Sequence, residues 1–161
     1  MKIAIVSDTH DNLANIKKAI DLMKKEKVEV LLHCGDISTQ ETLDEIAKNF
    51  FGEFHFVLGN MEEKKFPEEI FAENFKELKT EDKKISFTHF PDIAKELAKS
   101  QNYDIVFYGH THKPWEETLR RGSGRETRLV NPGNLAGIWY RATFAIYDTK
   151  TDKLELKILD L

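Results

Sequence analysis

The sequence has a single cysteine, Cys34, and lacks any long hydrophobic run. One thiol excludes an internal disulfide. Because no apolar stretch approaches the length of about 20 residues that a helical membrane span needs, no such span is expected. The sequence also lacks a basic segment followed by a small-residue cleavage site near Met1, so no secretory signal is expected. These absences favour a cytoplasmic location.

Neither sign of charge dominates the 161 residues, whose formal net charge is -4. Hydrophobic residues make up 40% and charged residues 32%, which is typical of a globular protein, and the length fits one domain over residues 1–161. A weakly acidic chain gives no general reason to expect nucleic acid or membrane surfaces as partners. The one candidate surface for nucleic-acid binding is a basic cluster formed by Arg120, Arg121, Arg125 and Arg128.

Hydrophobic periodicity predicts alternating strands and helices in the first 60 residues. Strands are expected at 2–7, 29–34 and 54–58, and helices at 12–27 and 39–49, the first of them capped by Asn12. This order implies parallel strands joined by right-handed crossovers.

The rest of the chain predicts further strands, some of them antiparallel. Residues 62–79 are highly charged and poorly periodic, so a surface loop with a helical turn at most is expected. Beyond it the pattern predicts a strand at 84–88, a helix at 92–100, a strand at 104–108, a hairpin over 117–129 that turns at 122–124, and paired strands at 143–148 and 153–159. The predicted class is α/β, with mixed sheets and helices on the outer faces.

Six polar segments stand out, and five of them directly follow a predicted strand. They are Asp8-Thr9-His10, Gly35-Asp36, Gly59-Asn60, Thr88-His89, Gly109-His110-Thr111-His112 and Asn131-Pro132-Gly133. In an open α/β sheet, the loops beyond the carboxyl ends of the strands meet in one crevice. The glycines allow sharp turns where strands end. These segments are therefore expected to converge.

The donor types in these segments favour borderline divalent metals. Two carboxylates, four imidazoles and one amide suit manganese, nickel, iron, cobalt or zinc; they belong to Asp8, Asp36, His10, His89, His110, His112 and Asn60. Seven ligands exceed what one open ion needs, but they suffice for two ions roughly 3.5–4 Å apart if a carboxylate bridges them. The other histidines, His33 and His55, are expected to be packed or partly exposed strand residues, and His33 can also support the ligands near Asp36.

The order of these motifs resembles the calcineurin-like metallophosphoesterases, especially their small single-domain prokaryotic phosphodiesterase branch of the YfcE type. This resemblance implies a four-layer αββα sandwich with two sheets flanked by helices. It also implies a dinuclear site in which Asp36 bridges the ions. The first ion would be held by Asp8, His10, Asp36 and His112, and the second would be completed by Asn60, His89 and His110.

The function that the resemblance implies is metal-dependent hydrolysis of a small phosphodiester by a hydroxide that the metal pair activates. The residues expected to act in catalysis are Asp36, Asn60 and His89. Met61 stands where many family members have a histidine that protonates the leaving group, so the proton must come from water or Glu62, or the leaving group departs without one. Phe90 follows His89 where the family often has His-Gly-His, so an apolar wall is expected there.

Alternative interpretations remain open. The chain can be a phosphomonoesterase or a nucleotide-directed nuclease of the same fold, or a non-catalytic scaffold similar to the retromer subunit, although complete ligands favour an enzyme. We expect Trp115, Trp139 and Tyr140 to serve packing or to rim a loop rather than to stack on bases. Three further residues, Phe66, Phe71 and Phe75, are candidates either for a homodimer or higher oligomer contact or for capping the core.

Overall fold

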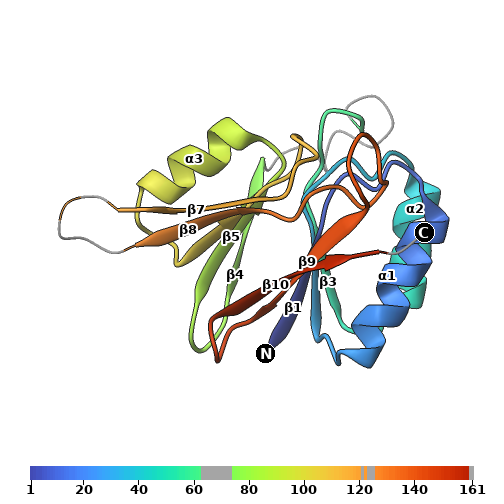
Figure 1. Cartoon of the computed structure of the whole chain (residues 1–161), viewed down its shortest axis with the longest axis horizontal. Helices are drawn as coiled ribbons and strands as arrows, with labels where there is room; N and C mark the ends of the chain where they lie inside the picture. Colours follow the sequence, from blue (N-terminus) through green and yellow to red (C-terminus); the bar gives the residue numbers. More distant parts are fainter. Residues whose placement is uncertain (63–73, 121, 123–125, 160–161) are drawn as a thin grey trace.

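The computed structural model describes residues 1–62, 74–120, 122 and 126–159. Over these residues, ten strands form two five-stranded sheets, and three helices accompany them. Helices α1 (Leu13–Lys25) and α2 (Gln40–Asn49) cover one sheet, α3 (Pro91–Lys99) covers the other, and the sheets face each other between them (Figure 1). The predicted four-layer αββα sandwich is thus confirmed.

The first sheet has the strand order β10-β9-β1-β2-β3. Its strands are β1 (Lys2–Val6), β2 (Val30–His33), β3 (Glu53–Phe56), β9 (Thr143–Asp148) and β10 (Lys153–Ile158). The strands β1, β2 and β3 are parallel, as predicted, whereas β9 runs antiparallel to both β1 and β10. The predicted N-cap is also present, because the Asn12 side chain accepts a hydrogen bond from the Asn15 N–H.

The second sheet has the strand order β4-β5-β6-β8-β7. Its strands are β4 (Phe75–Lys79), β5 (Lys84–Thr88), β6 (Ile105–Phe107), β7 (Trp115–Leu119) and β8 (Thr127–Asn131). Parallel pairing joins β5, β6 and β8, while β4 and β7 form antiparallel edges. The predicted hairpin corresponds to β7 and β8, and it begins two residues earlier than expected.

The strand β4 corrects the expectation of a loop over residues 62–79. Its burial alternates between exposed and intermediate along Phe75–Lys79, as in an edge strand with only one partner. The sequence of β4 is dominated by charge, so its own propensity does not reveal it. Backbone pairing with the buried strand β5 stabilises it. Residues 63–73, with Phe66 and Phe71, lie outside the described part of the chain, while Phe75 is 38% exposed.

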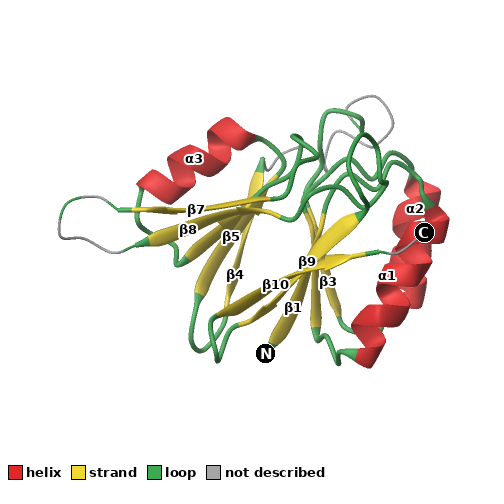
Figure 2. Ribbon diagram, viewed as in Figure 1, coloured by secondary structure: helices red, strands yellow, loops and turns green. Residues whose placement is uncertain are grey.

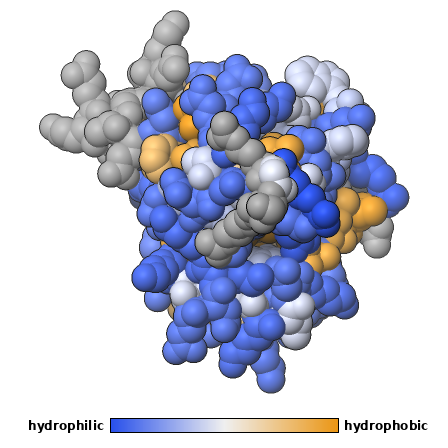
Figure 3. Space-filling model, turned by 90° about the vertical axis from the view of Figure 1, so that its left-hand side faces the viewer, coloured by the Kyte–Doolittle hydropathy of each residue, from blue (hydrophilic) through white to orange (hydrophobic). Residues whose placement is uncertain are grey.

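The core fills the layer between the two sheets and the layers between each sheet and its helices. Fully buried residues such as Ile3, Ile5, Phe87 and Phe107 face one another across the layer between the sheets. The face that α3 covers is mostly hydrophilic, with only separate hydrophobic areas (Figure 3), which fits an amphipathic helix packed through Ala94 and Ala98. Within the described ranges, no helix combines the length and apolar character that crossing a bilayer requires.

Candidate metal centre

The loops that follow β1, β2, β3, β5, β6 and β8 gather at one end of the sandwich, at the top of Figure 2. Parallel strands from both sheets end there, so the convergence that the sequence predicts is realised across two sheets. All seven predicted ligands lie on these loops, immediately beyond their strands.

Four of the seven side chains form one compact group. A ligand atom from each lies within 4.8 Å of the others, and the four residues are Asp8, His10, Asp36 and His112. The His10 and His112 Nε2 atoms are 3.4 Å apart, and His112 Nε2 is 3.2 Å from Asp8 Oδ1. Donors held at bonding distance around one first-row ion lie roughly 3.0–3.6 Å from one another. The spacing therefore fits a shared cation.

The other three side chains form a second group, on the other side of the Asp36 carboxylate. Asn60 Oδ1 lies 3.2 Å from His89 Nε2 and 3.1 Å from His110 Nδ1, and the two imidazole nitrogens are 3.2 Å apart. Asp36 faces both groups, because its Oδ1 is 3.5 Å from His89 Nε2 while its Oδ2 is 3.8 Å from His10 Nε2. One carboxylate thus presents one oxygen to each group.

Hydrogen bonding outside the groups leaves the inner nitrogen of His89 without a proton. The Nδ1 atom of His89 is 2.8 Å from the Cys34 carbonyl oxygen, which can only accept, so Nδ1 carries the proton and Nε2 presents a lone pair. In the Asp8 carboxylate, Oδ2 accepts from the His110 backbone N–H, while Oδ1 is buried and forms no hydrogen bond within the described part of the chain, although His112 Nε2 is near. Lone pairs that converge in this way are stabilised by cations.

The backbone of five of these residues is left-handed. Asp8, His10, Asp36, His110 and His112 have φ values of 53, 42, 57, 70 and 60°. A non-glycine residue in this region costs about 1 kcal/mol or more, and such strain concentrates at functional sites because the surrounding structure imposes it. The tight turns therefore aim the side chains inward at the expense of local backbone energy.

The electrostatics of the group are dominated by Asp8 and His112. Burial alone would raise the pKa of the Asp8 carboxyl, but contact with His112 holds this pKa below its usual value. Contact with Asp8 in turn raises the pKa of His112, although burial opposes the shift. An ionised aspartate at the centre of imidazoles is a suitable ligand for a divalent cation.

Buried His33 supports two of the ligand-bearing loops, as the sequence suggested. Its Nδ1 accepts from the Gly35 N–H at 3.1 Å, so Nε2 carries the proton and donates to Thr9 Oγ1 at 3.0 Å. Thr9 stands between two ligands on the loop after β1, and Gly35 precedes Asp36 on the loop after β2. The neutral ring thus links the two loops. Burial lowers the pKa of His33 to about 3.

This pKa predicts loss of stability in mild acid. The unfolded chain binds a proton at His33 near pH 6.5, whereas the folded chain does not do so until about pH 3. The contribution of neutral His33 to the free energy of unfolding is therefore complete above pH 6.5 and declines as the pH falls below this value. Between pH 6 and 4.5 it falls by about 2 kcal/mol. Urea unfolding with excess EDTA measures the slope without metal release.

The matched variant is His33→Asn, whose side-chain oxygen can still accept from Gly35. Its absolute stability is expected to be lower, but its pH slope above pH 4.5 is expected to be flatter than that of the wild type. An unchanged slope would mean that another group titrates.

Glu62 holds two other loops together. Its side chain is fully buried, and its oxygens accept from the Ser38 N–H at 2.9 Å and the Gly59 N–H at 2.7 Å. Both oxygens therefore act as acceptors toward the backbone, and neither is presented to the metal-binding groups. These contacts link the loop that carries Asp36 to the loop that carries Asn60, and the suggestion that Glu62 protonates a leaving group stays a prediction.

Asn131, the last residue of β8, and Asn134, beyond it, brace the loop that carries His110 and His112. Asn131 donates to the Gly109 carbonyl, and Asn134 donates to the His112 carbonyl at 3.1 Å. The sequence interpretation included Asn131 but missed Asn134. The Asn-Pro-Gly turn immediately before Asn134 was the available signal, because it places the next side chain in the same loop cluster.

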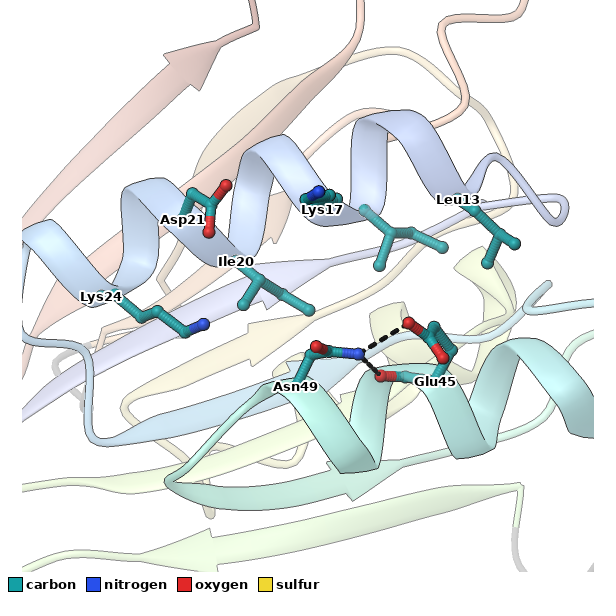
Figure 4. Close-up of a pocket in the computed structure, with 8 residues that line it drawn as sticks. Leu13, Lys17, Ile20, Asp21, Lys24, Glu45 and Asn49 are labelled. Carbon is teal, nitrogen blue, oxygen red and sulfur yellow. Dashed lines mark hydrogen bonds between the residues drawn. The ribbon is translucent and has the colours of Figure 1, made fainter.

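Other predicted features have structural roles. Cys34 is buried, and burial raises the pKa of its thiol, as expected of an inert cysteine. His55 is half-buried on β3 and pairs with Glu53. A groove between α1 and α2 is lined by Ile20, Asn49 and their neighbours, and none of the described residues lining it is a predicted ligand (Figure 4).

The basic cluster is largely neutralised where it is described. Arg128 pairs with Glu116 at 2.7 Å and with Asp152 at 3.4 Å, and Arg120 pairs with Glu126. Arg121 and Arg125 lie outside the described residues. Ion pairing of Arg128 within the protein weakens the case for phosphate binding by this hairpin.

Comparison with known proteins relates the whole chain to phosphoesterases. Residues 1–152 match the calcineurin-like phosphoesterase superfamily domain. Phosphodiesterase MJ0936 of Methanocaldococcus jannaschii is 31% identical over 99% of this chain and 100% of its own length. A solved archaeal phosphodiesterase superposes with a TM-score of 0.84 at 30% identity and covers 99% of this chain and 100% of its own.

A more distant structure shares the fold alone. Vps29 of Chaetomium thermophilum has a TM-score of 0.70 at 17% identity, and the match covers 99% of this chain and 97% of that one. At this identity the likeness concerns architecture, so the function has to be argued from the site.

Proposed function

Because the chain belongs to the calcineurin-like phosphoesterase superfamily and is a phosphoric ester hydrolase, we propose that it is a phosphodiesterase with a dinuclear metal site. The observation that carries the proposal is the position of Asp36, with Oδ2 toward His10 and Oδ1 toward His89. Asp8, His10, Asp36 and His112 hold one ion. Asp36, Asn60, His89 and His110 hold the other.

The donor set decides what the site can bind. When bound, the two ions supply an activated water and positive charge for the phosphoryl oxygens. Only Asp8 and Asp36 carry formal negative charge, so two divalent ions leave a net charge of +2, and the neutral Asn60 preserves that excess. The hydrogen bond from His89 Nδ1 to Cys34 fixes the ring orientation and keeps Nε2 available as a ligand. Manganese, nickel, iron, cobalt and zinc all suit these donors. The cytoplasmic location is an expectation from the sequence alone.

Metal removal tests the proposal. The protein stripped with EDTA is expected to hydrolyse bis(p-nitrophenyl) phosphate at the background rate, and added manganese or nickel is expected to restore turnover at about two ions per chain. Elemental analysis and calorimetric titration measure the stoichiometry. Full activity with one ion would contradict the dinuclear assignment. Absence of hydrolysis at full metal content would favour the scaffold alternative.

The residues near the leaving group predict a steep dependence on its acidity. The Met61 backbone N–H donates a hydrogen bond to Asp36 Oδ1, which places Met61 beside the site. Its side chain is 46% exposed and cannot donate a proton. Both carboxylate oxygens of Glu62 already accept hydrogen bonds from the backbone N–H groups of Ser38 and Gly59. We therefore expect kcat to fall strongly along a series of diesters with increasingly basic leaving groups.

Glu62→Gln separates the two roles of Glu62. As a positioning residue it is expected to lower stability and metal affinity, because one backbone N–H loses its acceptor, while the leaving-group slope stays unchanged. A steeper slope in the variant than in the wild type would identify Glu62 as the acid.

A further inference from the structure

We propose, building on the proposed function, that Trp139 is a substrate-positioning residue that stacks on a planar aromatic group in the ester arm that is retained after cleavage. The Trp139 ring centroid lies 5.0 Å from that of His112, with an angle of 37° between the planes. Trp139 is 84% exposed. A large aromatic surface thus stands in water directly beside a metal-binding group.

The backbone holds Trp139 in this place against its own preference. Its φ is 63°, in the left-handed region, where a bulky residue is uncommon. The segment before it is tied to the site, because Ala136 N–H donates to the Asp8 carbonyl and Ile138 N–H donates to Asn134 Oδ1. The exposure of the ring is therefore imposed by the loops that carry the ligands.

The rim has a second aromatic side chain at the other metal-binding group. The Phe90 ring meets the His89 ring edge-on, with centroids 5.1 Å apart. Trp139 and Phe90 therefore each lie beside one of the two groups, next to His112 and His89 respectively. An ester with an apolar or aromatic arm would contact carbon surface at this rim, and a small polar phosphate would not.

The position of Trp139 selects which arm it contacts. In an in-line displacement the attacking and leaving oxygens lie on opposite sides of phosphorus, and the substituents that stay on phosphorus lie around the middle between them. Trp139 lies at the flank of the ligand cluster, beside His112, and so borders the substituents that remain on phosphorus. Its ring can stack on an aryl ester or on a nucleobase, since both present a π face. The exposure of Trp139 fits the expectation of a loop-rim residue, and the proposal adds a role for its ring.

Three substrates with the same leaving group test the inference. They are methyl p-nitrophenyl phosphate, phenyl p-nitrophenyl phosphate and the p-nitrophenyl ester of thymidine 5′-phosphate. Trp139→Ala is expected to lower kcat/KM for the phenyl ester about ten-fold, mainly through KM, and to change the methyl ester less than about two-fold. Trp139→Phe is expected to recover most of the loss. Phe51→Ala, which removes another highly exposed ring far from the ligands, is the matched control.

A loss on both the phenyl and thymidine esters identifies a general aromatic subsite, and a loss on the thymidine ester alone identifies a nucleobase subsite. Equal losses on all three substrates, or no loss on any, overturn the inference. So does dissociation of a dimer by Trp139→Ala in analytical ultracentrifugation, because the ring would then serve self-association.

A binding measurement keeps this test separate from the test of hydrolysis. In a Trp115→Phe background, Trp139 is the sole tryptophan. Thymidine 5′-monophosphate is expected to quench its fluorescence in the zinc-loaded protein, whereas methyl phosphate is not. Quenching without any hydrolysis would refute the proposed function but keep the subsite. Hydrolysis with equal quenching by both phosphates would refute the subsite alone.

Discussion

Replacing Asp36 with asparagine is expected to lower kcat by about 1,000-fold, because the site loses the charge shared between its two groups. Met61 N–H donates to Oδ1 of Asp36 at 3.0 Å, so the asparagine oxygen should take that position and its NH2 should face His10. An NH2 group cannot bind a cation. The ion beside His10 should therefore be lost first, and elemental analysis should find at most one ion per chain.

Asp21→Asn provides the matched control, since it makes the same chemical change on the exposed surface of α1. It is expected to retain wild-type turnover and metal content. If Asp36→Asn kept two ions and near wild-type turnover, Asp36 would not be the bridge.

Gly109→Ala is expected to have the second-largest effect, although the change adds a single methyl group. A Cβ at this position would stand 1.9 Å from Ser7 Oγ and 2.9 Å from Asp8 Oδ2. Overpacking of this kind costs about 1–3 kcal/mol, and displacement of Asp8 is expected to weaken metal binding by a further 10- to 100-fold. Thermal unfolding with and without metal separates the two effects, because a damaged site loses its stabilisation by added metal.

Gly52→Ala is the control for this prediction. Its Cβ would meet the Glu29 carbonyl oxygen at 2.2 Å, so it should also destabilise the fold, but Gly52 lies just before β3, at the opposite end of the sheet from the site. The folded Gly52→Ala protein is expected to bind metal normally. If Gly109→Ala did the same, the close approach of Gly109 to Asp8 would have no role in the site.

Gly109 shows where sequence reasoning stopped. Its position after a strand suggested a sharp turn, yet its φ is not among the positive values, and the glycine is needed because Asp8 packs against it. Gly35 is required for both reasons, a positive φ and a close neighbour: its φ is 91°, and His89 Nδ1 lies 2.8 Å from the position that a Cβ would take. Which reason applies depends on residues more than 50 positions away in each case.

The sequence by itself determined the α/β class, most of the strands and helices, and the identity of the seven candidate ligands, while the four-layer arrangement was implied by the family resemblance. The sequence could do so because hydrophobic periodicity and the order of strand-end motifs are local properties of the chain. Only the tertiary structure decided the pairing of the charged edge strand β4, the role of Glu62 as a link between loops, and the placement of Trp139 beside His112. These features depend on contacts between distant segments, and no local pattern encodes them.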